Sequence, residues 1–150
     1  YFRFAVGNEV RLKGAYFVTC TDFVKDENGK VVEIHGTYDP ATKSGLDFTA
    51  RKVKGTVHWV NAATAVTADV NLYENLVVPD ENSENGYSMN PNSLTTVKAY
   101  IEPSIKGVKP MDRFQFMRNG YFVADSKHCT EEHLVFNRIV SLKSSFKPNK

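Results

Sequence analysis

The 150-residue sequence has few of the residues that usually fill helices, with seven leucines and ten alanines. No apolar run approaches the roughly 20 residues that a membrane-spanning helix requires. Hydrophobic residues make up 41% and charged residues 24% of the chain, which excludes a disordered protein. β-branched and aromatic residues are abundant, with 18 valines, 11 threonines and 18 aromatic residues. This balance predicts an all-β protein that is long enough to bury its own core.

Cysteine is also scarce. The two cysteines, Cys20 and Cys129, lie far apart in the sequence and match no metal-ligand spacing. His128 and His133 flank Cys129, but their spacing is not that of a zinc site and a fourth ligand is missing. We therefore expect no metal, and two free thiols in a cytoplasmic protein that does not associate with membranes.

The sequence lacks the motifs of common catalytic sites. It contains no glycine-rich phosphate loop, no nucleophile elbow and no HExxH pair. No carboxylate pair stands out from the other acidic residues. The chain also begins Tyr1-Phe2-Arg3-Phe4, without an initiator methionine. These features predict a non-catalytic fragment of a longer polypeptide.

The net charge of +2 is small, but its distribution is uneven. Residues 1–60 carry nine basic and seven acidic groups, residues 61–100 one and five, and residues 101–150 nine and five. Two basic ends and an acidic middle suit either an anionic partner or an ordinary solvated surface.

Alternation of apolar and polar residues indicates strands along most of the chain. A long hairpin is expected over residues 9–38, with strands over 9–18 and 31–38. In the first strand the alternation places Val10, Leu12, Tyr16 and Val18 on one side and Arg11, Lys13 and Phe17 on the other. A further hairpin is expected over 114–125, where Asn119-Gly120 separates two apolar runs. The other expected strands are residues 50–60, 67–74, 94–103 and 135–143. Residues 79–93 are polar and rich in turn formers, which indicates an excursion or a junction. This spacing predicts a β-barrel or a pair of small barrels.

Basic groups on these strands are the candidate binding residues. Arg11 and Lys13 are two residues apart, so a continuous strand would place both on one face, about 7 Å apart. This spacing suits contact with a base and its neighbouring phosphate. The alternative is that both are solvated surface charges.

A second candidate surface is the hairpin over residues 114–125. Gln115 and Arg118 flank the aromatic residues Phe114, Phe116 and Tyr121. Single-stranded RNA is bound in this way, with polar groups on base edges and aromatic rings as stacking platforms. The alternative is that the rings belong to the core. A third basic cluster, Arg51, Lys52 and Lys54, lies in the strand expected over 50–60. Alternation places Lys52 and Lys54 on one face of this strand and Arg51 on the other, apolar face.

The run RKVKGTVHWV over residues 51–60 is distinctive. Together with EVRLK (9–13), FQFMR (114–118), GYF (120–122) and FNR (136–138), it resembles the C-terminal anticodon-binding region of glutaminyl-tRNA synthetase. The matches run in order from about residue 3 to residue 143. The resemblance implies two small antiparallel β-barrels, with residues 1–75 mainly in the distal barrel and 94–150 mainly in the proximal one.

The family also implies roles for particular residues. Arg11 and Lys13 match basic positions near the first anticodon base, and Gln115 and Arg118 match groups that address the middle base, a uracil. Arg3 matches an arginine near the third base, and Lys143 a basic position near the anticodon loop. The implied partners are glutamine tRNA and the other domains of a monomeric parent ligase, which uses ATP with magnesium; the fragment itself is expected to need no cofactor.

The sequence departs from the family pattern at four positions. Lys13 and Lys143 stand where arginine is expected, Met117 where an acidic residue is expected, and Phe2 where lysine is expected. Replacing arginine by lysine removes a two-pronged hydrogen-bond donor. Two alternatives stay open: the same domain of an archaeal or eukaryotic-type glutamyl-tRNA synthetase, and a β-barrel protein-interaction or carbohydrate-binding module without RNA binding.

Overall fold

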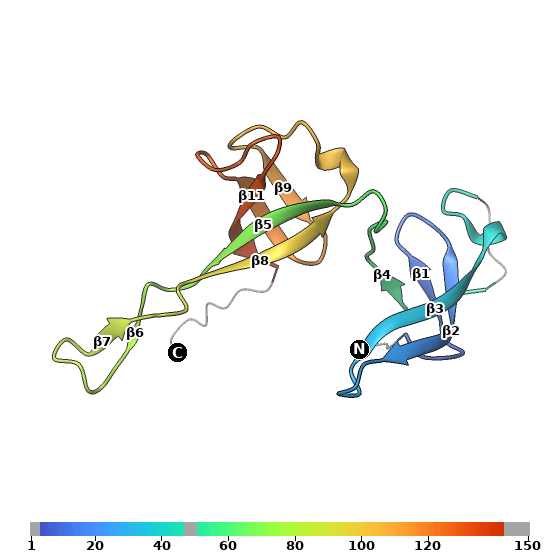
Figure 1. Ribbon diagram of the computed structural model, residues 1–150, viewed down its shortest axis with the longest axis horizontal. Helices are drawn as coiled ribbons and strands as arrows, with labels where there is room; N and C mark the ends of the chain where they lie inside the picture. Colours follow the sequence, from blue (N-terminus) through green and yellow to red (C-terminus); the bar gives the residue numbers. More distant parts are fainter. Residues whose placement is uncertain (1–3, 47–50, 143–150) are drawn as a thin grey trace. The chain divides into compact units, whose positions relative to one another are not determined.

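The computed structural model describes residues 4–46 and 51–142, and strands dominate it (Figure 1). This confirms the all-β prediction. The chain forms two compact units, Tyr1–Trp59 and Val60–Lys150, called unit 1 and unit 2 below. In the described ranges the strands pair in sheets of four, five and two strands.

Unit 1 holds the four-stranded sheet, in the order β3-β2-β1-β4. Its strands are β1 (Glu9–Leu12), β2 (Phe17–Lys25), β3 (Val31–Asp39) and β4 (Thr56–Val57). The expected hairpin therefore exists as β2 and β3, but the prediction of one strand over residues 9–18 is wrong. The chain reverses between β1 and β2, where Gly14 has a φ of +72° and the amide of Ala15 donates to the carbonyl of Leu12 at 3.0 Å.

The strand expected over residues 50–60 is also wrong, because within 51–60 only β4 is regular. This segment runs parallel to β1. The amide of Arg11 donates to the carbonyl of Gly55 at 2.8 Å, and the amide of Lys13 donates to that of Val57 at 2.9 Å. Since only two residues join the ladder, the alternation that placed Lys52 and Lys54 on one face does not apply.

The core of unit 1 is small. Its buried residues are Val10, Ala15, Phe17, Cys20 and Thr42. Thr42, in the short 3-10 helix η1 (Pro40–Thr42), is the buried polar residue of this set. Its hydroxyl accepts from the amide of Phe17 at 2.8 Å and donates to the carbonyl of Asp39 at 2.6 Å. Both hydrogen-bonding capacities are used, so its burial carries no desolvation penalty for an unpaired group.

Unit 2 contains the five-stranded sheet, in the order β8-β5-β11-β10-β9. These strands are β5 (Val66–Tyr73), β8 (Leu94–Ile101), β9 (Arg113–Phe116), β10 (Gly120–Ala124) and β11 (Leu134–Ser141); the 3-10 helix η2 (Pro103–Ile105) follows β8. The strands expected from alternation over 67–74, 94–103 and 135–143 correspond to β5, β8 and β11, and the hairpin over 114–125 corresponds to β9 and β10.

One face of this sheet forms the core of unit 2. Phe136 is fully buried there and contacts Phe114 and Phe116 edge to face, with ring centroids 5.8 and 5.2 Å apart. Phe116 also stacks on Phe122 at 4.5 Å. The rest of this core is apolar and comes from β5, β10, β11, η2 and the loop before β11: Ala68, Val70, Ile105, Ala124, Cys129 and Leu134, flanked by Ala99 and Ile101 of β8. Val135 belongs to the same buried cluster, although its register partner is Asp69.

The opposite face of the sheet is polar and hydrogen-bonded. The Oγ1 of Thr96 donates to Asn71, whose Nδ2 donates to Asn137, whose Nδ2 donates to Asp125, over distances of 2.7, 2.9 and 2.7 Å. These contacts join β8, β5, β11 and the loop after β10. The pKa of Asp125 is held well below its usual value, mainly by the hydrogen bond from Asn137 and by the amides of the following loop.

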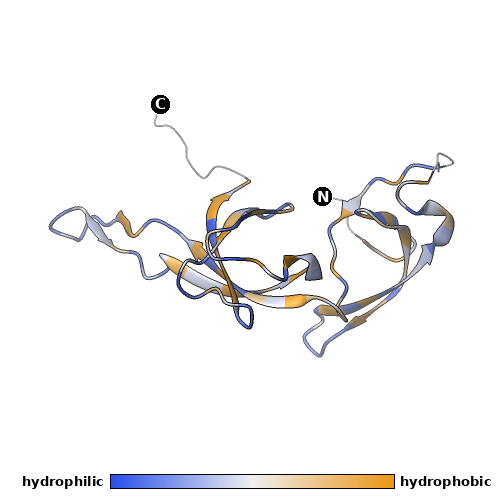
Figure 2. Cartoon of the chain, turned by 90° about the horizontal axis from the view of Figure 1, so that it is seen from above, coloured by the Kyte–Doolittle hydropathy of each residue, from blue (hydrophilic) through white to orange (hydrophobic). Residues whose placement is uncertain are grey.

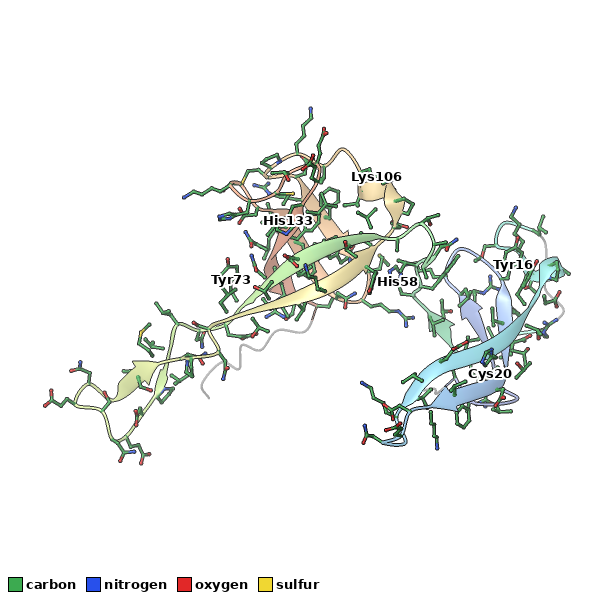
Figure 3. All side chains as sticks on the ribbon, in the orientation of Figure 1. Tyr16, Cys20, His58, Tyr73, Lys106 and His133 are labelled. Carbon is green, nitrogen blue, oxygen red and sulfur yellow. The ribbon has the colours of Figure 1, made fainter. Side chains whose placement is uncertain are left out.

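A second contact on the same face centres on Asp69 in β5. Its carboxylate lies 2.7 Å from the Nζ of Lys98 and 2.8 Å from the Nε2 of His133. Figure 3 labels His133 beside β11 and Tyr73 at the end of β5. The hydrogen bonds from Lys98 and His133 lower the pKa of Asp69.

The polar stretch over residues 79–93 forms most of an arm. Strands β6 (Val77–Pro79) and β7 (Tyr87–Met89) pair antiparallel and extend from the end of β5 and β8 (Figure 1). The loop at its tip is hydrophilic (Figure 2). Among the ranges that the structure describes, no helix is long and apolar enough to cross a membrane.

Candidate nucleic-acid interface

Arg11 lies in a row of three residues that crosses unit 1. It is the direct partner of Phe17 on β2, and Phe17 is the partner of Asp39 on β3. The guanidinium carbon of Arg11 lies 4.4 Å from the centroid of the Phe17 ring, a cation–π contact. Its Nη1 lies 3.4 Å from the hydroxyl oxygen of Ser44. Within the described residues Arg11 forms no ion pair, so no carboxylate occupies its guanidinium.

Arg51 lies on the same side of unit 1 and is fully paired. Its guanidinium donates to both carboxylate oxygens of Glu9, at 2.9 and 2.7 Å, and to Asp39 at 2.8 Å. It also lies 5.3 Å from the Phe17 ring. These hydrogen bonds lower the pKa of Glu9 and of Asp39 and raise that of Arg51.

Sequence reasoning placed Arg51 on an apolar strand face and missed this cluster. Its two carboxylate partners lie 42 and 12 residues away in the chain. The sequence held one signal for this cluster. Alternation places Glu9 and Arg11 on one face of a strand, and a carboxylate beside a guanidinium indicates that a further charged residue binds there.

Lys13 does not share a strand face with Arg11, so that expectation is wrong. β1 ends at Leu12, and Lys13 begins the turn toward β2, with an exposed side chain. Its carbonyl accepts a hydrogen bond from the Nε1 of Trp59 at 3.1 Å. The backbone of Lys13 is therefore fixed by β4 and Trp59, while its ammonium group stays in solvent.

The β9–β10 hairpin presents Gln115 on the exposed face of the sheet. Gln115 is the direct partner of Tyr121 on β10, and 44% of Tyr121 is exposed. Phe114 and Phe116 pack against the core, so of the two alternatives the core assignment holds for these two rings. Tyr121 is the aromatic residue of this hairpin that is open to a ligand.

The turn of this hairpin lies earlier than Asn119-Gly120. The amide of Asn119 donates to the carbonyl of Phe116 at 2.9 Å, so Met117 and Arg118 occupy the central positions. Arg118 has a φ of +67°, a conformation that few residues other than glycine adopt. Its exposed side chain is thereby presented at the tip of the hairpin, three residues after Gln115 and outside the β9–β10 ladder.

Two of the predicted binding residues are not described, and the other four are divided between the two units. Arg3 and Lys143 lie outside the described residues. Arg11 and Lys13 belong to unit 1, whereas Gln115 and Arg118 belong to unit 2. Cys20 and Cys129 are free and buried. The described residues contain no group of three metal-ligating side chains.

Comparisons with known proteins identify the family of this chain. Two models of the family described as tRNA synthetases class I (E and Q), anti-codon binding domain, match residues 1–39 and 56–125. The glutamine–tRNA ligase of Clostridioides difficile is 60% identical over 155 residues, covering 100% of this chain and 28% of that protein. That of Clostridium perfringens is 58% identical over 98% of this chain and 27% of the relative, and that of Nitrosomonas europaea 45% over the same shares. The chain thus spans little more than a quarter of these relatives, and it belongs to the anticodon-binding domains of the class I glutamine and glutamate tRNA synthetases.

Proposed function

We propose that this chain is the anticodon-binding part of a glutamine–tRNA ligase and binds the anticodon loop of glutamine tRNA. The observation that carries the proposal is the 60% identity, over the whole chain, to a protein named glutamine–tRNA ligase. In this proposal the parent enzyme attaches glutamine to tRNA with ATP and magnesium in the cytoplasm, as a monomer. Those steps belong to its other domains, and this chain contributes binding and discrimination.

In this proposal, residues of unit 1 and residues of unit 2 bind different bases of the anticodon. Arg11 and Lys13 are assigned to the first base, and Gln115 and Arg118 to the middle uracil. Arg3 and Lys143 are assigned to the third base and the adjoining loop by family likeness alone. The assignment of residues 1–75 to the distal barrel and 94–150 to the proximal barrel likewise stays a proposal.

The geometry supports these roles chemically. Arg11 has a guanidinium that forms no ion pair in the described part of the chain and is held over an aromatic ring, which suits contact with both a phosphate and a base edge. Gln115 offers a donor and an acceptor beside the exposed ring of Tyr121. When a wrong base leaves such groups unpaired, discrimination of about 1–3 kcal/mol per contact results.

A titration with RNA tests the proposal. The 150-residue chain is titrated with the anticodon stem-loop of glutamine tRNA, with a copy whose middle uracil is changed, and with the stem-loop of glutamate tRNA, each at two salt concentrations. We expect salt-sensitive binding that is tightest for the glutamine anticodon. A preference for the glutamate stem-loop would assign the chain to a glutamyl-tRNA synthetase. An absence of RNA binding would favour a protein-interaction module.

A further inference from the structure

We propose that Arg51 is a positioning residue for RNA binding, which keeps Glu9 from pairing with Arg11 and so leaves the Arg11 guanidinium available to the ligand. The inference rests on the proposed function of Arg11, and it assigns a role to a residue that the family likeness did not single out.

The register of unit 1 brings the acidic and basic groups together. Glu9 and Arg11 are two residues apart on β1, so their side chains lie on the same face of the strand. Across the sheet, one row is Arg11, Phe17 and Asp39, and the next is Glu9, Thr19 and Thr37. Asp39 thus lies at the far end of the row that contains Arg11, and Glu9 lies beside Arg11 in the next row.

Arg51 connects these two rows from a distant part of the chain. Its two-pronged contact with Glu9 uses both oxygens of that carboxylate, and its Nη2 also reaches Asp39. Paired hydrogen bonds of this geometry are among the stronger ones in proteins. Glu9 is fairly well shielded, with 22% of its side chain exposed, whereas 41% of Arg51 is exposed. Both oxygens of the Glu9 carboxylate are therefore held by Arg51, and the described residues show no ion pair between Glu9 and Arg11.

Removing Arg51 would change both the geometry and the charge of the site. In the described cluster both carboxylates are hydrogen-bonded to Arg51, and neither forms an ion pair with Arg11. Without Arg51, Arg11 would be the remaining guanidinium for these two carboxylates, and the nearer one along the strand is Glu9. A pair between Glu9 and Arg11 would occupy the Arg11 guanidinium, which would then no longer be available to RNA, and draw it off the Phe17 ring.

Arg51 also ties β1 to the end of β3 and covers part of Phe17, so loss of binding in a variant could reflect a disturbed fold. The two explanations predict different results when Glu9 is also changed. If Arg51 acts by occupying Glu9, removing the charge of Glu9 restores binding. If Arg51 acts only as a clamp, removing Glu9 takes away one more contact and restores nothing.

The experiment measures the affinity of the 150-residue chain for the glutamine anticodon stem-loop in five forms: the wild type, Arg51→Met, Glu9→Gln, the double variant Glu9→Gln with Arg51→Met, and Lys52→Met. The last is the matched control, because it removes an adjacent exposed cation. We expect Arg51→Met to bind about tenfold more weakly and the double variant to return to within about threefold of the wild type. Lys52→Met should lose less affinity than Arg51→Met.

Three results would overturn the inference: unchanged affinity in Arg51→Met, equal weakening in the single and double variants, or equal weakening in Lys52→Met. Thermal melts identify a variant that does not fold.

If Arg51→Met fails to fold, the affinity of Glu9→Gln distinguishes the two explanations. The inference predicts that Glu9→Gln binds RNA at least as tightly as the wild type. Weaker binding would show that Arg51 and Glu9 act only as a structural clamp. Failure of the wild type itself to bind RNA would instead refute the proposed function on which this inference rests.

Discussion

Arg11 and Phe17 are direct partners across the β1–β2 ladder, and the Arg11 guanidinium carbon lies 4.4 Å from the centroid of the Phe17 ring. The contact explains how a ring that is only 1% exposed lies at a charged surface, since the guanidiniums of Arg11 and Arg51 cover it. It also holds the guanidinium of Arg11 in a fixed plane, so less side-chain entropy is lost when RNA binds.

The first prediction is that Arg11→Ala weakens binding of the glutamine anticodon stem-loop by about 1–3 kcal/mol. Arg11→Lys should recover only part of this loss, because lysine keeps the charge but has neither the planar fork nor the stacking surface. Fluorescence anisotropy with labelled RNA measures both. Affinity unchanged in Arg11→Ala would remove this residue from the binding surface.

Sequence patterns correctly predicted the strands that pair regularly with a neighbouring strand. β5, β8 and β11 follow from period-two alternation because one face of their sheet is buried. The reversal at Gly14 was missed because the alternation of Val10, Leu12, Tyr16 and Val18 continues through it. The same alternation nevertheless placed Arg11 and Phe17 on one face, where the structure has them.

The segment after Arg51 was misjudged for a different reason. Its valines alternate as in a strand, but a strand needs a neighbour along its whole length, and only Thr56 and Val57 pair with β1.

The candidate binding site was likewise predictable only in part. The cluster of Arg51, Glu9 and Asp39 depends on contacts between distant segments, which no local pattern encodes.

The second prediction concerns acid stability. Arg51 lowers the pKa of Glu9 and Asp39 in the folded chain below their usual values of 4.5 and 3.8. Groups with a lowered folded pKa stabilise the fold above the unfolded pKa, and this contribution is lost as the pH falls through the folded pKa. The melting temperature of the wild type should therefore fall more steeply below about pH 4.5 than that of Arg51→Met.

Thermal melts at a series of pH values between neutrality and pH 3 measure this difference. Asp69 and Asp125 also have lowered pKa values, but they are unchanged in the variant and cancel in the comparison. Parallel curves for the two proteins would show that the contacts of Arg51 do not persist in solution.

The third prediction concerns Gly120, the first residue of β10. Its φ is +151°, and a Cβ at this position would lie 2.5 Å from the carbonyl oxygen of Val140. Gly120→Ala should therefore destabilise the chain by about 1–3 kcal/mol from backbone strain alone, with the clash added. Gly29→Ala is the matched control, because Gly29 also has a positive φ, of +77°, but has open space around it.

Urea unfolding of both variants gives the comparison. Gly120→Ala should unfold at a clearly lower urea concentration than Gly29→Ala. Equal destabilisation would mean that the strand pairing of β10 and β11 adjusts to the added methyl group.

The fourth prediction separates the binding face of the β9–β10 hairpin from its core face. Gln115→Ala should reduce discrimination against a changed middle base by about 1–3 kcal/mol, while its melting temperature stays near that of the wild type because Gln115 is exposed. Phe116→Ala should do the reverse, because its ring stacks on Phe122 and contacts Phe136. Its loss should lower the free energy of unfolding by about 3 kcal/mol. Titration of each variant with the true and altered stem-loops, beside a thermal melt, measures both effects. If Gln115→Ala discriminates as well as the wild type, the middle base is bound elsewhere, and Arg118 at the tip of the hairpin becomes the next residue to test.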